Sequence, residues 1–444
     1  MLRRLLFVLI ILLINFNAYA KYDSIKLKNG LRVFVEENKS LPIVNVTVFY
    51  RVGCADEHNS ITGISHMLEH MNFRGSKHFK DGYIDRLTSK FGGVDNAQTS
   101  FDYTVYFATI DKSAWKKALA FYADNMNNLM LDKKKFLKER SVVYQERLWR
   151  IDNSADGFLY YSLHNLAYVA SPYRWTPIGY RDDIQHYTIN ELKAYYKRFY
   201  APNNAVIVVS GDVDRHDVFD LIRKLFKEKK PVKIVRHITK EPKQNGRRMM
   251  YITKPASFKK IAMGFKIPKE GDKDTPTLDL ISYILFSGKT ALMEKDLVRD
   301  KRIFASINGG NEGRIYDVGL FEIFGDIEKG VGFEQARKAI LKELDKIKTG
   351  HFDNKLLEMA KAKCVSDYMF DKEKLSLKNR DFAFYAAFGL KDYMDRYVEL
   401  IKGVTKKDVI DVANRYFVEN AENDCFLVPQ KGKDLGSVFR GVLR

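Results

Sequence analysis

Apolar residues along the first half of the chain fall into two patterns. Runs rich in Val, Phe and Tyr predict strands, and apolar residues three or four positions apart predict helices. Strands are predicted at residues 24–37, 43–52, 99–110 and 205–210, and helices at 63–73, 82–91, 112–130, 133–150, 155–168, 189–198 and 215–226. Strands and helices follow one another in runs rather than in strict alternation, which favours an α+β fold with mostly antiparallel sheet.

The second half repeats this order after a basic stretch, residues 227–248, that is poor in apolar residues. Strands are predicted near 261–267, 303–309, 317–326 and 424–428, and helices near 278–286, 293–298, 332–348, 353–369, 375–388, 391–401 and 405–416. The repeated order indicates two similar α/β-sandwich-like units related by internal duplication. Because 444 residues exceed a single core, we place an N-terminal unit at 21–230, a linker at 231–248 and a C-terminal unit at 249–444.

Residues 1–20 have the pattern of a signal peptide. Arg3 and Arg4 precede an apolar run, 5–16, which is short for a membrane-spanning helix, and Ala18-Tyr19-Ala20 offers a cleavage site. We expect cleavage before Lys21 and a periplasmic or secreted protein. A retained N-terminal anchor is the alternative, and nothing else in the chain resembles a transmembrane segment.

Charge and cysteine content change this picture little. A net charge of +19 raises the question of nucleic acid, but Lys and Arg are spread throughout without a basic stripe interleaved with aromatics, so solvated surface charge is favoured. Cys54, Cys364 and Cys425 form no C-x-x-C pair. A bridge between Cys364 and Cys425 is possible in an exported protein but is not deducible, and Cys54 is interpreted as a small buried residue.

One short stretch carries the candidate chemistry. His66, Glu69 and His70 form the pattern H-x-x-E-H, known as the inverzincin signature. In a helix, His66 and His70 lie four apart on one face and could bind one metal ion, and Glu69 lies beside them. The alternative is a surface helix with two unrelated histidines.

Catalytic zinc usually takes three protein ligands, so a further carboxylate is expected from another element. Glu146 is the best candidate. It lies on the predicted helix 133–150, seven residues after Glu139, so that both carboxylates share one face of that helix.

Together these features resemble the pitrilysin/insulinase family of zinc metallopeptidases, which includes the mitochondrial processing peptidases; the chain looks like an exported bacterial member. The resemblance extends over Leu27–Val33, Gly92–Ala97, Ser171–Tyr173 and Tyr200–Ala205, and it is looser beyond about residue 240.

The resemblance implies one Zn²⁺ per chain, bound by His66, His70 and Glu146. The ion would lower the pKa of a bound water, and Glu69 would take its proton as general base. It also implies that Glu139 orients a histidine from outside the ligand set; the reverse assignment, with Glu139 as ligand, is the alternative.

Substrate peptides of the family add a strand to a sheet edge, which would lie here around residues 96–101. The resemblance therefore makes Asn96 and Ala97 the candidate substrate contacts. A plain turn residue is the alternative interpretation of Asn96.

The chain departs from the family's active members at one place. These members use an arginine and a tyrosine from the opposing half, and in the preferred alignment Val298 and Ala305 occupy those positions, with Arg299 one place off. A chain with the zinc motif but without this pair resembles the catalytic half of a dimer, possibly a heterodimer whose partner supplies the Arg/Tyr pair.

The sequence thus predicts a zinc metalloendopeptidase that hydrolyses peptides or unfolded segments. A non-catalytic scaffold or assembly subunit of the same family is the second hypothesis, and the intact set of His66, Glu69, His70 and Glu146 argues against it. A basic protein that binds nucleic acid is a third, which rests on net charge alone and is disfavoured by the signal segment.

Overall fold

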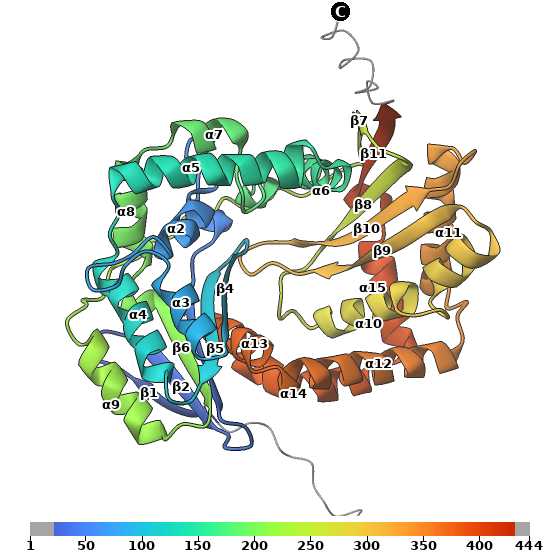
Figure 1. The fold of residues 1–444 in the computed structure, drawn as a ribbon. Helices are drawn as coiled ribbons and strands as arrows, with labels where there is room; N and C mark the ends of the chain where they lie inside the picture. Colours follow the sequence, from blue (N-terminus) through green and yellow to red (C-terminus); the bar gives the residue numbers. More distant parts are fainter. Residues whose placement is uncertain (1–21, 431–444) are drawn as a thin grey trace, which may run out of the picture.

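A computed structural model describes residues 22–430, which form two mixed units of sheet and helices joined by one extended segment (Figure 1). The α+β prediction with two similar halves is confirmed. The predicted signal peptide, residues 1–20, lies outside the described residues.

The N-terminal unit is built on a six-stranded sheet in the order β1-β2-β6-β3-β5-β4. Its strands are β1 (Asp23–Lys26), β2 (Arg32–Glu37), β3 (Ile43–Tyr50), β4 (Val94–Thr99), β5 (Thr104–Asp111) and β6 (Ala205–Gly211). Its helices are α2 (Ile64–Asn72), α3 (Tyr83–Lys90), α4 (Trp115–Asn128), α5 (Lys133–Arg147), α6 (Ala155–Ala167), α7 (Arg181–His186), α8 (Ile189–Phe199) and α9 (Arg215–Phe226). Apart from the parallel pair of β2 and β6, neighbouring strands are antiparallel, and β4 forms a free edge.

The C-terminal unit has a five-stranded sheet in the order β7-β11-β8-β10-β9. Its strands are β7 (Arg248–Pro255), β8 (Lys259–Ile267), β9 (Phe304–Glu312), β10 (Gly319–Ile327) and β11 (Glu422–Gln430). Its helices are α10 (Thr275–Phe286), η5 (Met293–Asp300), α11 (Phe333–Lys348), α12 (Asn354–Glu373), α13 (Leu375–Phe388), α14 (Lys391–Gly403) and α15 (Lys406–Tyr416). Again one pair, β7 with β11, is parallel and the others are antiparallel.

Three of these elements were not predicted as such, and one predicted strand is divided. β4 was missed because the strand predicted at 99–110 begins at its last residue and runs across the turn into β5. β7 was missed because it is an edge strand whose alternate residues are exposed, so its Arg and Lys residues resemble a linker. α7 was missed because it has six residues and buries only Ile184. The strand predicted at 24–37 is two strands, since a turn with Gly30 at φ 90° separates β1 from β2.

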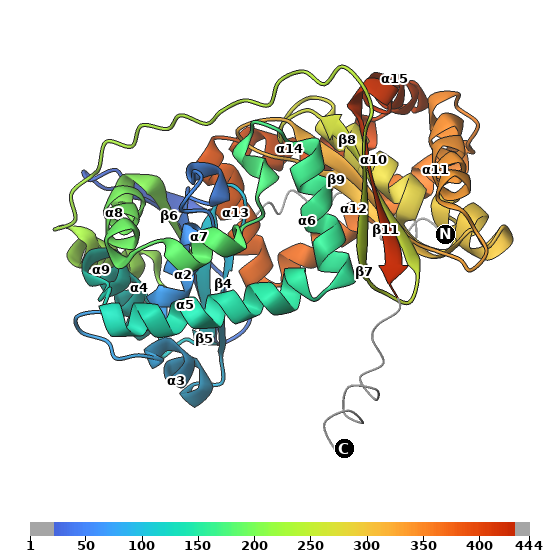
Figure 2. The ribbon, with the colours of Figure 1, turned by 90° about the horizontal axis from the view of Figure 1, so that it is seen from above.

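Each unit covers part of the other unit's sheet with one helix. α6, from the N-terminal unit, packs on β7, β8 and β11 (Figure 2), where Leu159 and Leu163 are buried against Ala262 and Leu427. α13, from the C-terminal unit, packs on β3, β5 and β6, where Phe382 joins the apolar residues of those strands. Full burial of a side chain of this size contributes about 1.5–3 kcal/mol, so both exchanges stabilise the assembled chain.

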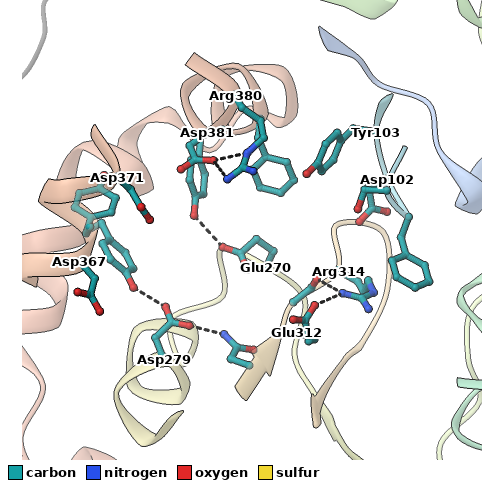
Figure 3. Close-up of a pocket in the computed structure, with 18 of the residues that line it drawn as sticks. Asp102, Tyr103, Glu270, Asp279, Glu312, Arg314, Asp367, Asp371, Arg380 and Asp381 are labelled. Atoms are coloured by element: carbon teal, nitrogen blue, oxygen red, sulfur yellow. Dashed lines mark hydrogen bonds and ion pairs between the residues drawn. The ribbon is translucent and has the colours of Figure 1, made fainter. Parts of the chain in front are cut away.

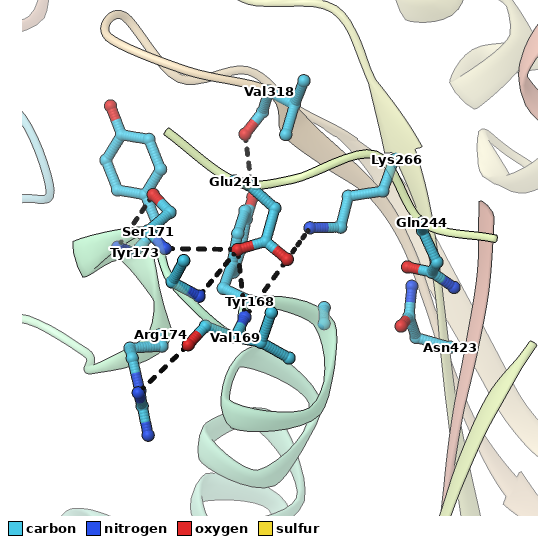
Figure 4. A network of polar contacts seen from close by, with 12 residues as sticks. Tyr168, Val169, Ser171, Tyr173, Arg174, Glu241, Gln244, Lys266, Val318 and Asn423 are labelled. Atoms are coloured by element: carbon cyan, nitrogen blue, oxygen red, sulfur yellow. Dashed lines mark hydrogen bonds and ion pairs between the residues drawn. The ribbon is translucent and has the colours of Figure 1, made fainter. Parts of the chain in front are cut away.

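The segment that joins the units is fixed along its length. Residues 227–247 form no helix or strand and cross from one unit to the other (Figure 2). Nε of Arg236 lies 2.7 Å from Oδ1 of the buried Asp56 in the N-terminal unit. Further along, Glu241 accepts hydrogen bonds from the N–H groups of Val169, Ala170 and Ser171 at 3.0–3.2 Å (Figure 4).

Glu241 also lies 3.4 Å from Nζ of Lys266, which comes from β8 of the C-terminal unit. Burial acts to raise the pKa of Glu241, but these donors and the ammonium group hold it below its usual value. The carboxylate therefore remains charged at neutral pH and ties the linker to both units.

The three cysteines are buried and unbridged, so the bridge considered between Cys364 and Cys425 is not formed. Cys364 lies in the core of the C-terminal unit and Cys425 lies under α6. Across residues 22–430, no helix combines the length and the apolar character that crossing a membrane requires.

Candidate metal centre

Helix α2 presents the H-x-x-E-H residues on the face opposite to its buried side chains. Ile64, Met67, Leu68 and Met71 are fully buried in the core, while the two histidines and Glu69 are only partly buried. The helix begins after Gly63, which has φ 85° and lies against the main chain of Ile178. Glu57 accepts the N–H groups of Gly63 and Ser65 at 2.7 and 2.9 Å and so caps the first turn of the helix, while burial raises the pKa of its carboxyl group to about 8.

The structure brings His66, His70 and Glu146 together. Nε2 of His66 and Nε2 of His70 lie 3.7 and 3.3 Å from Oε2 of Glu146, and one ligand atom from each residue lies within 4.8 Å of the others. Nδ1 of His66 is buried without a hydrogen-bond partner. Two imidazoles and one carboxylate are a donor set of catalytic zinc sites, so these residues fit a zinc ion.

The two histidines differ in charge. Burial and the neighbouring His70 lower the pKa of His66 to about 3, so it is neutral at pH 7. Burial would also lower the pKa of His70, but hydrogen bonds to Glu139 and Glu146 raise it to about 9. The metal-free site therefore carries one imidazolium between two carboxylates.

Glu139 and Glu146 contact different nitrogens of the same histidine. Oε1 of Glu139 lies 3.0 Å from Nδ1 of His70, whereas Glu146 faces Nε2. Glu139 is almost fully buried and also accepts hydrogen bonds from Arg74 at 2.7 and 3.0 Å, which help to hold its pKa below the usual range although burial opposes them. Arg74 lies two residues beyond the end of α2 and was not among the predicted site residues.

Glu146 is the last residue but one of α5 (Lys133–Arg147). The helix continues as a π-helical turn, Leu148–Asp152, and Nε of Arg150 in that turn lies 2.8 Å from Oε1 of Glu146. Burial opposes the shift, but the two histidines and Arg150 hold the pKa of Glu146 below its usual value. Glu146 is thus ionised across the neutral range, as metal binding requires.

The free edge strand β4 passes beside α2. Asp95, Ala97 and Thr99 point inward, while Val94, Asn96 and Gln98 are exposed. The hydroxyl of Thr99 donates a hydrogen bond to Oε2 of Glu69, a contact that the sequence analysis missed. Oδ1 of Asn96 accepts the N–H of Ala97 at 2.9 Å, so the two candidate substrate contacts are joined by a local hydrogen bond.

The two residues that the preferred alignment sets at the family's Arg/Tyr positions lie in the other unit. Val298 packs partly against the core of that unit, and Ala305 is exposed on the edge strand β9. Arg299 is exposed on η5 and donates to the carbonyl of Lys289 at 3.2 Å.

A separate cavity of about 520 Å³ lies where the two units meet, just beyond the end of β4 (Figure 3). Seven carboxylates and two guanidinium groups line it: Asp102, Glu270, Asp279, Glu312, Asp367, Asp371 and Asp381, with Arg314 and Arg380. Burial raises the pKa of Glu270 to about 8 and that of Asp102 to about 6. The carboxyl groups lie close to one another, and the lining offers two guanidinium groups to stabilise seven charged carboxylates.

Fold and site together define a two-unit α+β protein with an inverted zinc motif completed by a helical glutamate. Residues 32–174 match the family model "Insulinase (Peptidase family M16)", and residues 186–364 match the model "Peptidase M16 inactive domain". The chain belongs to the insulinase family, peptidase family M16.

Similar proteins carry consistent names. The chain is 37% identical to "Zinc protease PqqE" of Helicobacter pylori over 92% of this chain and 93% of that protein, and 24% identical to "Uncharacterized zinc protease YmxG" of Bacillus subtilis over 88% and 95%. The crystal structure of a protease from Helicobacter pylori superposes with a TM-score of 0.89 at 36% identity, covering 92% of this chain and all of that chain. The periplasmic protease PqqL of Escherichia coli shares the fold at 18% identity and a TM-score of 0.74, covering 92% of this chain and 48% of that chain.

Proposed function

We propose that the chain is a zinc-dependent metalloendopeptidase that hydrolyses peptides or unfolded protein segments. The observation that carries this proposal is the convergence of two imidazoles and a carboxylate beside Glu69 and a free sheet edge. The names of the similar zinc proteases support it.

His66, His70 and Glu146 would hold one Zn²⁺, which when bound supplies Lewis-acid activation of a water and of the peptide carbonyl. Glu69 accepts the proton of the attacking water and passes it to the leaving amine. Glu139 accepts the Nδ1 proton of His70, which keeps Nε2 free as a metal ligand.

The peptide would lie extended along β4 and add a strand to the sheet. In this position Asn96 and Ala97 contact its main chain, and the Asn96 side chain moves away from the Ala97 N–H that it now occupies. Recognition through the main chain fits a peptidase for unfolded segments rather than for folded proteins.

We further propose that the chain works in a dimer in which a family subunit supplies the missing Arg/Tyr pair. We also propose a periplasmic or secreted location after cleavage before Lys21. Val298 and Ala305 at the family's Arg/Tyr positions support the first part. The periplasmic location named for the PqqL protease supports the second.

The test is hydrolysis of a quenched fluorescent peptide library by purified residues 21–444 supplied with zinc. We expect cleavage, alone or with a co-purified family subunit, that is lost in Glu69→Gln at unchanged zinc content. A chain that takes up no zinc, or that cleaves nothing with its partner present, would favour the scaffold or assembly subunit instead.

A further inference from the structure

The side chain of Glu69 is joined to the sheet edge through Thr99. Thr99 is the last residue of β4, and its hydroxyl donates to Oε2 of Glu69. A hydroxyl at the end of the edge strand therefore faces the Glu69 carboxylate.

Thr99 also belongs to the residues of β4 whose main chain faces the free edge. N–H and C=O groups of successive residues in a strand point alternately to its two sides. The N–H of Ser100 donates to the carbonyl of Tyr103, just before β5, at 2.8 Å. The N–H of Ala97 donates instead to Oδ1 of the Asn96 side chain. Ala97 and Thr99 therefore direct their main-chain groups away from β5, toward the place of an added strand.

The position of Thr99 is fixed from its other side. Thr99 pairs with Thr104 in the antiparallel register, and the buried hydroxyl of Thr104 donates to the carbonyl of Val52 at 2.8 Å. The turn that follows is held by the N–H of Ala55, which donates to the carbonyl of Phe101 at 2.8 Å. The hydroxyl that faces Glu69 thus belongs to a well-supported part of the sheet.

We propose that Thr99 is a positioning residue, which holds the Glu69 carboxylate at a fixed place relative to the strand on which an extended peptide lies. The inference rests on the proposed function, because it gives Thr99 a task in the same reaction. Glu69 has several rotatable bonds, and a carboxylate fixed before the reaction loses no side-chain freedom when it takes the proton.

The kinetic test compares Thr99→Val with Thr99→Ser in the preparation that cleaves peptide. Valine keeps the branched shape and loses the donor, so we expect kcat to fall about 10- to 100-fold, as for other outer partners of a metal site. KM and zinc content stay unchanged, and Thr99→Ser restores most of kcat. Thr109→Val is the matched control, because it removes a hydroxyl that accepts from Nδ2 of Asn45 at 2.9 Å, five positions further along the β4–β5 ladder; it leaves kcat unchanged.

A second measurement uses the metal-free protein and needs no activity. Thr99→Val lowers Tm in the wild-type background and by much less in Glu69→Ala, because the acceptor is then already absent. Equal shifts in both backgrounds, or a kcat that Thr99→Val leaves unchanged, would overturn the inference. A zinc-loaded wild type that cleaves nothing would count against the proposed function, while the coupling between Thr99 and Glu69 would still be measured.

Discussion

At the scale of single residues, His70 divides its two ring nitrogens between two carboxylates of one helix. Glu139 is buried and paired with Arg74, while Glu146 faces the open side with His66. Two glutamates two helical turns apart are chemically alike in the sequence, and their surroundings distinguish them.

This difference predicts unequal effects of two matched substitutions. Glu146→Gln removes a candidate ligand and should abolish stoichiometric zinc binding. Glu139→Gln removes only the acceptor of the His70 Nδ1 proton, so zinc affinity should fall about 10- to 100-fold. Competition with a chromogenic chelator measures both, and a larger loss in Glu139→Gln would reverse the assignment of the two residues.

The charge of His70 predicts that zinc binding releases a proton. With a pKa of about 9 this histidine is protonated in the metal-free site at pH 7, whereas His66, with a pKa of about 3, is already neutral. Since a ligand imidazole must be neutral, about one proton leaves per zinc below pH 9 and fewer above it.

Calorimetric titration at pH 7 in buffers of different ionisation enthalpy measures this number. Glu139→Gln is the control, because loss of its carboxylate lowers the pKa of His70 and reduces the release. Binding without proton release at pH 7 would show that His70 is neutral before zinc arrives.

Helical spacing predicts that His66, Glu69 and His70 share one face, whereas Glu146, on another helix, was expected from the need for a third ligand and from the family resemblance. Thr99 and Arg74 could not be found in this way. Their contacts join separate elements or depend on which face of α5 meets α2, and local spacing does not contain that information.

At the scale of elements, the start of α2 decides where the histidines lie. A Cβ on Gly63 would be 2.3 Å from the carbonyl oxygen of Ile178, and one on Gly179 would be 2.3 Å from the main chain of Thr62. Two glycines thus let the loop before α7 approach the first turn of the metal helix.

Gly63→Ala should therefore destabilise the protein more than Gly92→Ala. Both residues have positive φ, which costs a side chain about 1–2 kcal/mol. Nothing lies within 4 Å of a Cβ on Gly92, whereas Gly63→Ala adds about 1–3 kcal/mol of crowding and displaces the histidines. Urea unfolding and zinc affinity report the difference; equal losses would mean that the close approach is easily relaxed.

Periodicity predicted most elements but not which apolar residues they bury. On α5, Phe136 and Val143 are buried, whereas Leu137 and Val142 are more than 40% exposed. A helix can have apolar residues on its exposed face and still show the helical pattern. Which of its apolar residues are buried is therefore known only from the packed structure. β7 shows the reverse case, an edge strand whose polar residues hide the pattern.

At the scale of the whole molecule, the exchange of α6 and α13 predicts that the two units depend on each other. Residues 21–230 alone would expose the apolar face of β3, β5 and β6 that Phe382 now covers. We expect this fragment and residues 249–444 to be insoluble when expressed separately and to form a soluble complex when co-expressed. A monomeric, cooperatively folded fragment 21–230 would contradict this expectation.

The cavity between the units predicts a pH dependence of stability. The folded state holds a proton on Glu270 up to about pH 8, while the usual glutamate pKa is 4.5. Because the folded state binds this proton more tightly, its contribution to stability is complete below about pH 4.5 and is lost as pH rises to 8.

Glu270→Gln removes this titration from the boundary between the units. Between pH 5 and pH 8, the Tm of the wild type should fall relative to that of the variant. Asp102, with a pKa of about 6, should add a smaller decrease of Tm at the acidic end of this range in both proteins. Thermal unfolding across this range measures the difference. Parallel curves would show that Glu270 ionises normally.

The exchanged helices also bear on how such a chain could arise. α6 and α13 occupy equivalent places in the order of elements of the two halves, and each covers the sheet of the other half. Equivalent surfaces in mutual contact are the isologous arrangement of a two-fold symmetric dimer. An ancestral single unit of this fold would have had a bare sheet face unless it paired with a second copy. Duplication of such a unit would fuse the two subunits of a helix-swapped dimer into one chain, in which the linker keeps the two halves together.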